Sequence, residues 1–349
     1  MNNFENRSKR RTGLPQRACI LVLIMIFMIF AAGCDKEPAG EGITTDLLED
    51  TVAAVGTARI SLAEWYLYAM PKVSSATALY GKDIWKYHIS DEEGSIADAV
   101  KEDILKQIIY VKIVCSRAEQ LGISLNEDEL GDIETETLKY MNTLTAAQKQ
   151  KYGITEEAVR NVYCDNLLAM KVYENLTLNI DTDIPDEEVR HTVIEYICAN
   201  KYYENGDDGI ERFSDEELAE LKTKIEELYE RALSDPEIKK LSQLDNEQYA
   251  AIEMVADYSG LAEKFSKELA DKVFNMRESE ILGVFDTDDA FFIFDCVKRN
   301  DEEATNKAKI EIIEKRQREL FEQEYAHWEE GTIIKINYPV WDAIEIVEE

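Results

Sequence analysis

The helical period of residues 95 to 121 constrains the fold more than any other stretch of the chain. Apolar residues recur there at steps of four and three, which places them on one face of an α-helix. They are Ile104, Ile108, Val111, Cys115 and Ala118. Further apolar residues widen this stripe, namely Leu105, Ile109 and Val114. A helix this apolar must be covered on several sides, so we expect it at the centre of a helical body, with a stop at Gly122.

Shorter elements flank this helix. Before it, two apolar runs within residues 52–60, separated by Gly-Thr, predict a small hairpin. Ser61 with Glu64 three residues on then predicts a capping box that opens a helix to about Lys72. After the central helix we expect three further helix starts, at Asn126, Thr155 and Pro185.

The pattern changes after residue 190. Residues 191–203 are rich in β-branched and aromatic side chains and predict a strand, and residues 280–298 predict a hairpin. Between them we expect a helix opened by a capping box at Ser214, then mostly irregular structure, then a helix over 261–274. Helical periodicity returns over 301–329, and the last residues are strand-like. The predicted fold class is therefore mainly α with an α+β insert.

The first 33 residues have the three parts of a secretory signal peptide. A basic segment precedes an uncharged run from Ala18 to Ala32, which is shorter than the ~20 residues of a membrane-spanning helix. The sequence Ala31-Ala32-Gly33-Cys34 resembles the bacterial lipobox, with Ala31 where Leu is commoner. The resemblance implies that Cys34 becomes the first mature residue and carries the lipid. The alternatives are an uncleaved anchor helix and an ordinary secretion signal.

The net charge of −33 excludes whole classes of partner. Such a surface repels nucleic acid and anionic lipid headgroups, so we expect no nucleic-acid binding and a body that stands off the membrane. Affinity for basic clients or for Ca²⁺ is compatible with this charge, although solubility alone explains it. Two acidic loops, residues 181–188 and 205–211, lack the ligand spacing of an EF-hand.

Four cysteines lie beyond residue 34, and none forms a C-x-x-C pair. They are Cys115, Cys164, Cys198 and Cys296. We expect small buried hydrophobes, with a Cys198–Cys296 bridge as the alternative because both fall in predicted strands of one domain. With three histidines in the chain, a zinc site is poorly supported, and no phosphate-binding loop or nucleophile elbow is present. We therefore expect no metal and no cofactor.

Three stretches resemble the extracytoplasmic foldases of the SurA and PrsA type. "AAVGTARISLAEW" is similar to the opening strand-turn-strand-helix of that family. "DILKQIIYVKIVCSRAEQLGISLNEDEL" is similar to its helix ending in A-x-x-x-G-I before an acidic helix start, and "KYGITEEAVRNVYCDNLLAMKVY" to its next helical stretch. The resemblance implies a helical chaperone domain, split in sequence by a parvulin-like peptidyl-prolyl isomerase domain.

This resemblance sets the domain boundaries that we expect. They are a lipoprotein signal peptide at 1–33, a tether at 34–51, the first part of the chaperone domain at 52–190, a parvulin-like domain at 191–300, and a C-terminal helix and strand at 301–349 that complete the chaperone domain.

The parvulin-like part departs from the family at its catalytic positions. "EYICANK", "FSKELADKVFNMRESEI" and "DDAFFIFDCVKR" resemble the first strand, the helix with hairpin entry and the last strand. Tyr196 and Phe292 then stand where the family has histidines, and Phe265 and Leu269 at its substrate-pocket Met and Phe positions. His191 would fill the first histidine position only with a shifted strand register. We therefore expect an apolar pocket without its polar network and without isomerase activity.

Together these features predict a lipid-anchored extracytoplasmic chaperone or foldase that binds unfolded secreted polypeptides. Aromatic side chains bind such segments with little loss of entropy, so we name five candidate contacts, with core packing as their alternative role. They are Trp65, Tyr66, Tyr68, Trp85 and Tyr87. One alternative function is an active peptidyl-prolyl isomerase that uses His191. The other is a surface scaffold or solute-binding lipoprotein, whose usual strand-helix alternation is absent. The sequence does not give the client or distinguish a monomer from a dimer.

Overall fold

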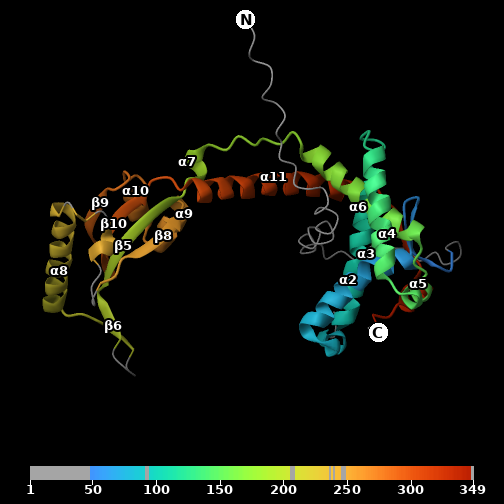
Figure 1. Ribbon diagram of the computed structural model, residues 1–349. Helices are drawn as coiled ribbons and strands as arrows, with labels where there is room; N and C mark the ends of the chain where they lie inside the picture. The colour runs from blue at the N-terminus through green and yellow to red at the C-terminus, as the bar shows by residue number, and fades with distance from the viewer. Residues whose placement is uncertain are drawn as a thin grey trace, which may run out of the picture. The chain divides into compact units, whose positions relative to one another are not determined.

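The computed structural model describes residues 48–90, 94–204, 209–235, 237–238, 240–244 and 249–346. The chain falls into two compact units: unit 1 is Met1–Asn179 with Arg318–Glu349, and unit 2 is Ile180–Gln317 (Figure 1). The predicted signal peptide, Cys34 and the tether up to residue 47 lie outside the described residues. The structure is mainly helical with small antiparallel sheets, which confirms the predicted fold class.

A three-stranded antiparallel sheet joins the two chain segments of unit 1. Its order is β11-β1-β2, with β1 at Thr51–Val55, β2 at Ala58–Ser61 and β11 at Ile334–Ile336. The predicted hairpin is β1 and β2, and Gly56 makes its turn at φ +57°, where other residues would be strained. On the other side of β1, Ala53 pairs with Ile336 and Val55 with Ile334. A strand near the C-terminus is therefore held by the start of the described chain.

The helices of unit 1 bury their apolar faces against one another. They are α2 (Leu62–Tyr80), α3 (Ile96–Cys115), α4 (Glu127–Thr143), α5 (Ala146–Tyr152), α6 (Glu156–Thr177), the last part of α11 (Glu302–Glu330) and α12 (Tyr338–Asp342). The 3-10 helix η2 (Lys82–Lys86) and a hairpin of β3 (His88–Ser90) and β4 (Gly94–Ser95) follow α2. Asn126 and Thr155 are N-caps, as predicted.

Helix α3 lies at the centre of the unit 1 core. Ile104, Ile108 and Ile113 on this helix are fully buried, which confirms the role predicted from its wide apolar stripe. Trp65 of α2 and Phe321 of α11 are buried in the same cluster. Residues on both chain segments therefore share one core.

The sequence prediction fails in three places in unit 1. Helix α3 ends at Cys115, and turns follow it to Gly122, where the stop was predicted. Helix α2 continues through Pro71 to Tyr80 instead of ending near Lys72, and its Glu64 does not close the predicted capping box. The Glu64 carboxylate lies instead 2.8 Å from the Lys112 ammonium in the interior. At the C-terminus only β11 is a strand, since the short helix α12 follows it with a proline in its first turn.

Unit 2 is built on a four-stranded antiparallel sheet of order β8-β5-β10-β9. Its strands are β5 (Thr192–Asn200), β8 (Ile252–Ala256), β9 (Ile281–Asp286) and β10 (Ala290–Lys298), and a separate hairpin is formed by β6 (Tyr202–Glu204) and β7 (Ile210–Arg212). Its helices are α7 (Asp186–Val189), α8 (Asp215–Ser234), η4 (Leu241–Leu244), α9 (Tyr258–Lys264), α10 (Lys267–Val273) and the first part of α11.

Each face of this sheet has its own core, because successive side chains of a strand point to opposite faces. On one face, Ile194 and Tyr196 of β5 pack with Phe294 of β10 and with residues of α9 and α10. On the other, Ile197 of β5 and Ile293 of β10 pack with α8 and η4. The sheet therefore carries two separate surfaces on one set of strands.

Three features of unit 2 differ from the prediction. The predicted strand over 191–203 is broken into β5 and β6. The predicted helix over 261–274 is broken at Ser266, whose hydroxyl caps α10 by accepting from the Leu269 amide. Strand β8 was expected to be irregular. Within it, Ile252 and Val255 are about half exposed, so its sequence carries no clear burial pattern.

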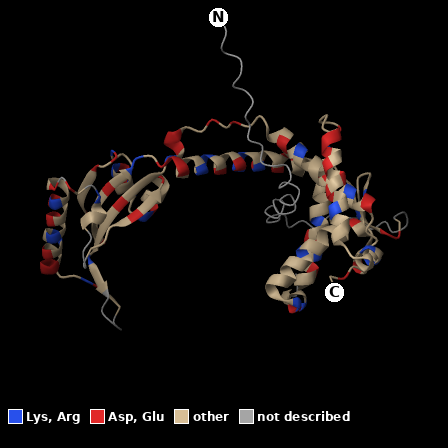
Figure 2. Cartoon of the chain, in the orientation of Figure 1, with Lys and Arg blue, Asp and Glu red and all other residues tan. Residues whose placement is uncertain are grey.

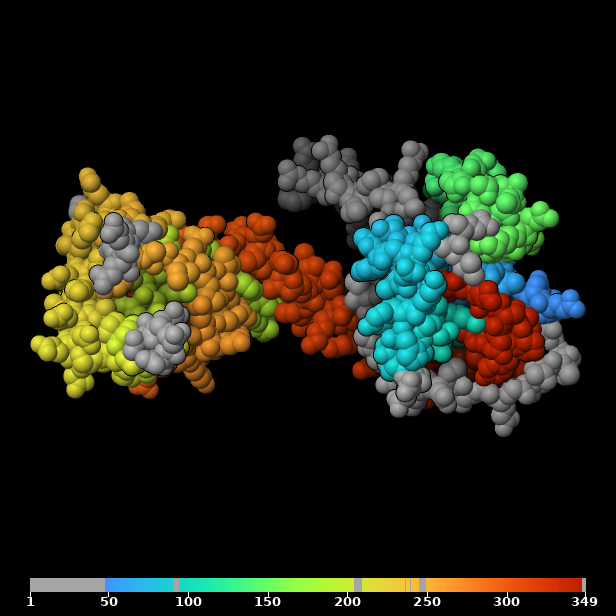
Figure 3. Space-filling view, turned by 90° about the horizontal axis from the view of Figure 1, so that it is seen from below, coloured from blue at the N-terminus to red at the C-terminus, as the bar shows by residue number. Residues whose placement is uncertain are grey.

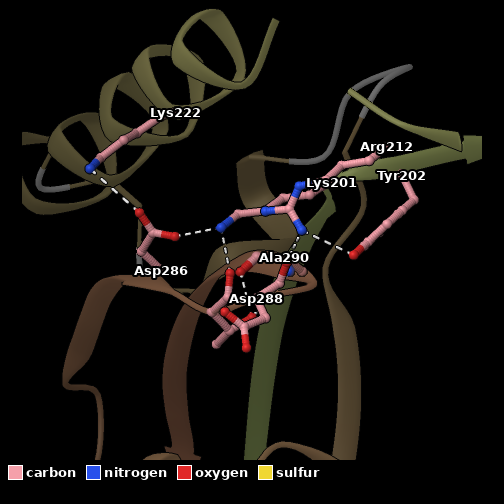
Figure 4. Close-up of polar contacts among 8 residues, drawn as sticks. Lys201, Tyr202, Arg212, Lys222, Asp286, Asp288 and Ala290 are labelled. Atoms are coloured by element: carbon pink, nitrogen blue, oxygen red, sulfur yellow. Dashed lines mark hydrogen bonds and ion pairs between the residues drawn. The ribbon is translucent and has the colours of Figure 1, made fainter. Parts of the chain in front are cut away.

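Charged contacts fix the end of the sheet at which β5 leaves it (Figure 4). Lys201 is buried, and its ammonium contacts the Asp286 carboxylate in the β9–β10 turn region. Lys222 of α8 lies 3.6 Å from the same carboxylate. Arg212 of β7 donates to the Asp288 carbonyl at 3.1 Å. These contacts tie the β6–β7 hairpin and α8 to the sheet.

Two of the helices carry many charged side chains. Acidic and basic residues intersperse along α8 and α11 (Figure 2). Across the part of the chain that the structure describes, no helix is both long enough and apolar enough to span a bilayer.

Candidate functional site

Three of the four predicted pocket residues come together on one face of the unit 2 sheet. The ring of Tyr196 on β5 lies 5.0 Å from Phe265, which follows α9, and 6.4 Å from Phe292 on β10. Phe265 and Phe292 are 5.4 Å apart. Phe294 is the direct partner of Tyr196 across the strands, so Tyr196 and Phe292 form a diagonal pair. The fourth residue, Leu269, is buried on α10 but is not packed in this aromatic cluster.

The polar groups near this aromatic cluster include a lysine and a thiol besides the hydroxyl of Tyr196 itself. The Lys264 ammonium lies 5.5 Å from the ring centre of Tyr196 and 5.9 Å from that of Phe265, within the range of a cation–π contact. Cys198 is the strand partner of Phe292, and burial raises the pKa of its thiol although Lys264 opposes this. A protonated thiol and a lysine do not form the polar pair of two histidines.

The structure places His191 away from the aromatic cluster. It precedes β5 by one residue, and five residues of strand from it to Tyr196 correspond to roughly 17 Å. Its ring Nδ1 lies 2.9 Å from the Val189 carbonyl, and its backbone amide donates to the Thr305 hydroxyl. His191 therefore lies outside the aromatic cluster.

A second candidate site is a pocket in unit 1 of about 230 Å³. Side chains of α2 form one wall, and α5 and the C-terminal segment form the others. The lining residues are Trp65, Tyr66, Ala69, Met70, Val73, Ser74, Gln148, Tyr152, Glu345 and Ile346. In Figure 3, part of α2 in cyan and the C-terminal segment in red lie next to each other in this unit. Apolar and aromatic residues outnumber polar ones in the lining, but polar and apolar atoms share its surface equally, and Glu345 contributes one carboxylate.

Two of the residues that line this pocket are tyrosines whose rings are in contact. The rings of Tyr66 and Tyr152 lie 4.3 Å apart. Burial raises the pKa of Tyr66, and Tyr152 and Glu345 act in the same direction against Lys151. Tyr66 therefore stays neutral and keeps its hydroxyl as a hydrogen-bond donor beside an apolar surface.

The structure corrects three of the five predicted client contacts. Trp65, Tyr68 and Trp85 are buried, at 0%, 5% and 8% exposure. Trp65 packs edge-on against the Trp341 ring, the Tyr68 hydroxyl accepts from Asn166, and the Trp85 indole donates to the Thr77 hydroxyl. These rings are held by the core. Of the three, Trp65 also lines the unit 1 pocket.

The other two predicted aromatics have surface. Tyr66 is half-buried in the pocket, and Tyr87 is 65% exposed. Sequence reasoning missed the exposed Leu79, Tyr80 and Ile89 near Tyr87, because it ended α2 at Lys72. It also missed Tyr152 and Glu345, which are far from Tyr66 in sequence and reach it only through the fold.

The cysteines form no site. Cys115, Cys164, Cys198 and Cys296 are free thiols. The suggested Cys198–Cys296 bridge is wrong, because the register pairs Cys198 with Phe292 and Cys296 with Ile194. Among the described residues, no group of three or more His, Cys, Asp or Glu side chains is arranged to hold a metal ion.

No protein-family model and no curated protein matches the chain. Among solved structures, the chain is similar to one from a study of PEB4 and Cj1289, two SurA-like chaperones of Campylobacter jejuni. The two chains are 13% identical, and the similarity covers 82% of this chain and 98% of that one, with a TM-score of 0.29. It is also similar to the foldase protein PrsA of Streptococcus pneumoniae, with 14% identity, coverages of 66% and 86%, and a TM-score of 0.20. At these scores we argue function from the residues of this chain.

Proposed function

We propose that this protein is an extracytoplasmic chaperone that binds unfolded polypeptide through the unit 1 pocket. The observation that carries the proposal is the lining of this pocket, in which apolar and aromatic side chains surround the half-buried Tyr66 and Glu345 stands among them. Such a pocket can receive an apolar side chain, while the carboxylate pairs with a neighbouring Lys or Arg. The net charge of −33 favours the same basic segments.

The size of the pocket favours a side chain over a free solute. Its volume of about 230 Å³ is below the roughly 300–1,000 Å³ of small-molecule sites. Exposed apolar residues near the end of α2 offer further contact area for an extended segment. They are Leu79, Tyr80, Tyr87 and Ile89, which are 43% to 76% exposed. A polypeptide client therefore fits this unit better than the solute of a solute-binding lipoprotein.

We further propose that the parvulin-like unit does not isomerise prolyl bonds. The barrier to rotation is about 18–20 kcal/mol, and lowering it needs groups that stabilise a twisted peptide. The aromatic cluster of Tyr196, Phe265 and Phe292 supplies rings, a lysine and a protonated thiol. Its proposed role is binding or spacing. The domain boundaries proposed from the sequence, 52–190, 191–300 and 301–349, assign this unit to the middle segment.

The chaperone proposal is tested by suppression of aggregation. Light scattering of a chemically unfolded, basic model protein is followed on dilution into buffer with increasing amounts of the purified protein. We expect suppression by the parent, and a requirement for about fivefold more of the Tyr66→Ala variant, since central aromatic contacts commonly contribute 1–2 kcal/mol or more.

Tyr140→Ala is the matched control. Tyr140 is also a half-buried tyrosine of unit 1 and packs on Tyr163 at 6.3 Å, but it does not line the pocket. Equal behaviour of the two variants, or no suppression by the parent, would reject the proposal.

The isomerase alternative is tested with a proline-containing peptide whose cis-to-trans relaxation is followed optically. We expect a rate equal to that of the uncatalysed reaction for the parent and for His191→Ala. A faster rate with the parent that is lost in His191→Ala would establish the alternative function.

The lipid anchor, which we propose at Cys34, is tested by mass spectrometry of the N-terminal peptide and by fractionation. We expect a diacylglyceryl thioether on Cys34 in the membrane fraction. An unmodified Cys34 in a soluble fraction would reject the proposed lipid anchor.

A further inference from the structure

The two edges of the unit 2 sheet differ (Figure 1). Strand β9 at one edge is irregular, because its register with β10 shifts between Phe292 and Phe294, and α8 packs on residues of β9. Strand β8 at the other edge pairs with β5 in unbroken register, from Thr192 opposite Ala256 to Tyr196 opposite Ile252. Bulges protect an edge against further pairing, and a regular strand does not.

Strand β8 also lacks the lysine and the proline that commonly protect an edge strand, since it reads Ile-Glu-Met-Val-Ala. Ile252 and Val255 are 48% and 47% exposed on it. Among the described residues, its pairing is with β5 on one side. The backbone amide and carbonyl groups on the outer side of β8 can pair with the backbone of another extended segment, whatever side chains that segment carries.

The charge at this edge restricts which polypeptide segments can pair with β8. Glu253 of β8, Glu195 of β5 and Asp295 of β10 stand in one cross-strand row on the same face of the sheet. Glu253 is exposed, whereas Glu195 and Asp295 are 4% and 1% exposed. The Lys240 ammonium, 3.9 Å from Glu195, is the cation nearest this row among the described ion pairs. A strand added beside β8 therefore meets the negative charge of the exposed Glu253.

We propose that β8 binds an extended polypeptide segment by strand addition, with a Lys or Arg of that segment opposite Glu253. Opposite charges directly across two strands are stabilising and like charges are destabilising. A second copy of this chain is the less suitable occupant, because each copy carries Glu253 on the same strand and a net charge of −33. The choice of an unfolded client as partner rests on the proposed function, but the site lies in unit 2 and not in the unit 1 pocket.

The test uses fluorescent ten-residue peptides of alternating lysine and valine, with binding to the purified protein followed by anisotropy. Two further peptides carry N-methyl groups on alternate residues, one on the odd and one on the even positions. In a given register, one set of amides faces β8 and the other faces solvent. We expect one N-methyl peptide to bind as the parent peptide does, and the other to lose binding at least tenfold. Equal binding of both would overturn the proposal.

Substitutions of exposed residues test the charge. Glu253→Lys should weaken binding of the lysine peptide by about three- to tenfold and strengthen that of a glutamate-valine peptide, because it replaces an attractive cross-strand pair with a repulsive one. Glu226→Lys on α8 changes the net charge equally at another exposed site and should stay within about twofold of the parent.

Two other results would overturn the proposal. One is an equal effect of both substitutions, and the other is a dimer in sedimentation that Glu253→Lys dissociates. Tyr66→Ala should leave peptide binding to β8 unchanged. Failure of this inference is therefore distinguishable from failure of the chaperone proposal.

Discussion

Both units bury charged side chains, but they balance them differently. In unit 1 the Lys112 ammonium lies 2.8 Å from the Glu64 carboxylate and 2.6 Å from that of Asp165. In unit 2 the neighbours across the strands are two carboxylates, Glu195 and Asp295. The Ser242 amide and hydroxyl donate to Glu195, both at 2.9 Å. Neither oxygen of Asp295 has a hydrogen bond of normal geometry among the described residues, although the Leu241 backbone acts to lower the pKa of Asp295; in unit 1 the Glu64 Oε1 atom also lacks one apart from its ion pair with Lys112.

The pKa shifts follow this difference. Burial acts to lower the pKa of Lys112, but Glu64 and Asp165 outweigh it and hold the pKa above its ordinary value. Burial, with Glu195 acting in the same direction, raises the pKa of Asp295 to about 6. The partners of Lys112 therefore support its charged form, whereas burial raises the pKa of Glu64 beside it, as it does that of Asp295 in unit 2.

The largest expected effect is that of Lys112→Met, which removes the cation between two carboxylates. An uncompensated buried charge costs about 3–5 kcal/mol, so we expect a loss of that size in the free energy of unfolding of unit 1, measured by urea denaturation. Lys171→Met is the control, because Lys171 and Glu129 form a more exposed pair that should contribute about 1 kcal/mol or less. Equal losses of stability for the two variants would show that Lys112 stabilises unit 1 no more than the more exposed Lys171 does.

The next effect has the opposite sign and depends on pH. Because folded Asp295 holds its proton more tightly than the unfolded chain does, stability falls as pH rises from about 4 to about 6 and stays reduced above. Asn cannot ionise, so Asp295→Asn should be about 1–3 kcal/mol more stable than the parent at pH 7.5, and equal to it near pH 4. Thermal unfolding of both proteins across this range measures the difference. A variant that is less stable at every pH would contradict the comparison.

Elements with local signals were predictable from the sequence. The apolar stripe of α3, the caps at Asn126 and Ser214 and the β9–β10 hairpin all depend on residues a few positions apart. Strand β8 was missed because pairing with β5, and not its own side-chain pattern, makes it a strand. The full extent of α2 was missed because a proline inside a helix normally ends it.

Of the two candidate sites, one could be predicted from the sequence and the other could not. The aromatic cluster of Tyr196, Phe265 and Phe292 could be predicted, because a strand alternation and a motif resemblance both point to it. The unit 1 pocket could not, since Tyr66, Tyr152 and Glu345 come from three distant parts of the sequence. The burial of Trp65 and Trp85 likewise depends on partners that only the fold supplies.

The smallest expected effect is the loss of a helix N-cap, which should reduce stability equally in both units. Ser95 caps α3 in unit 1 and Ser214 caps α8 in unit 2, each in a capping box. Replacing either serine with alanine should cost about 1 kcal/mol, because a cap is a local interaction. Matched urea unfolding curves measure both. A large difference between the two variants would mean that the units differ in more than their buried charges.

The most direct test of the account is to ask whether polypeptide enters the unit 1 pocket. Tyr66 is replaced by the photo-crosslinker p-benzoylphenylalanine, and in a second protein Tyr140 is replaced in the same way. Each is irradiated with an unfolded basic client and with the same client folded. The account predicts crosslinks from position 66 to the unfolded client alone, and few from position 140. Crosslinking from position 140 that equals or exceeds that from position 66 would contradict it.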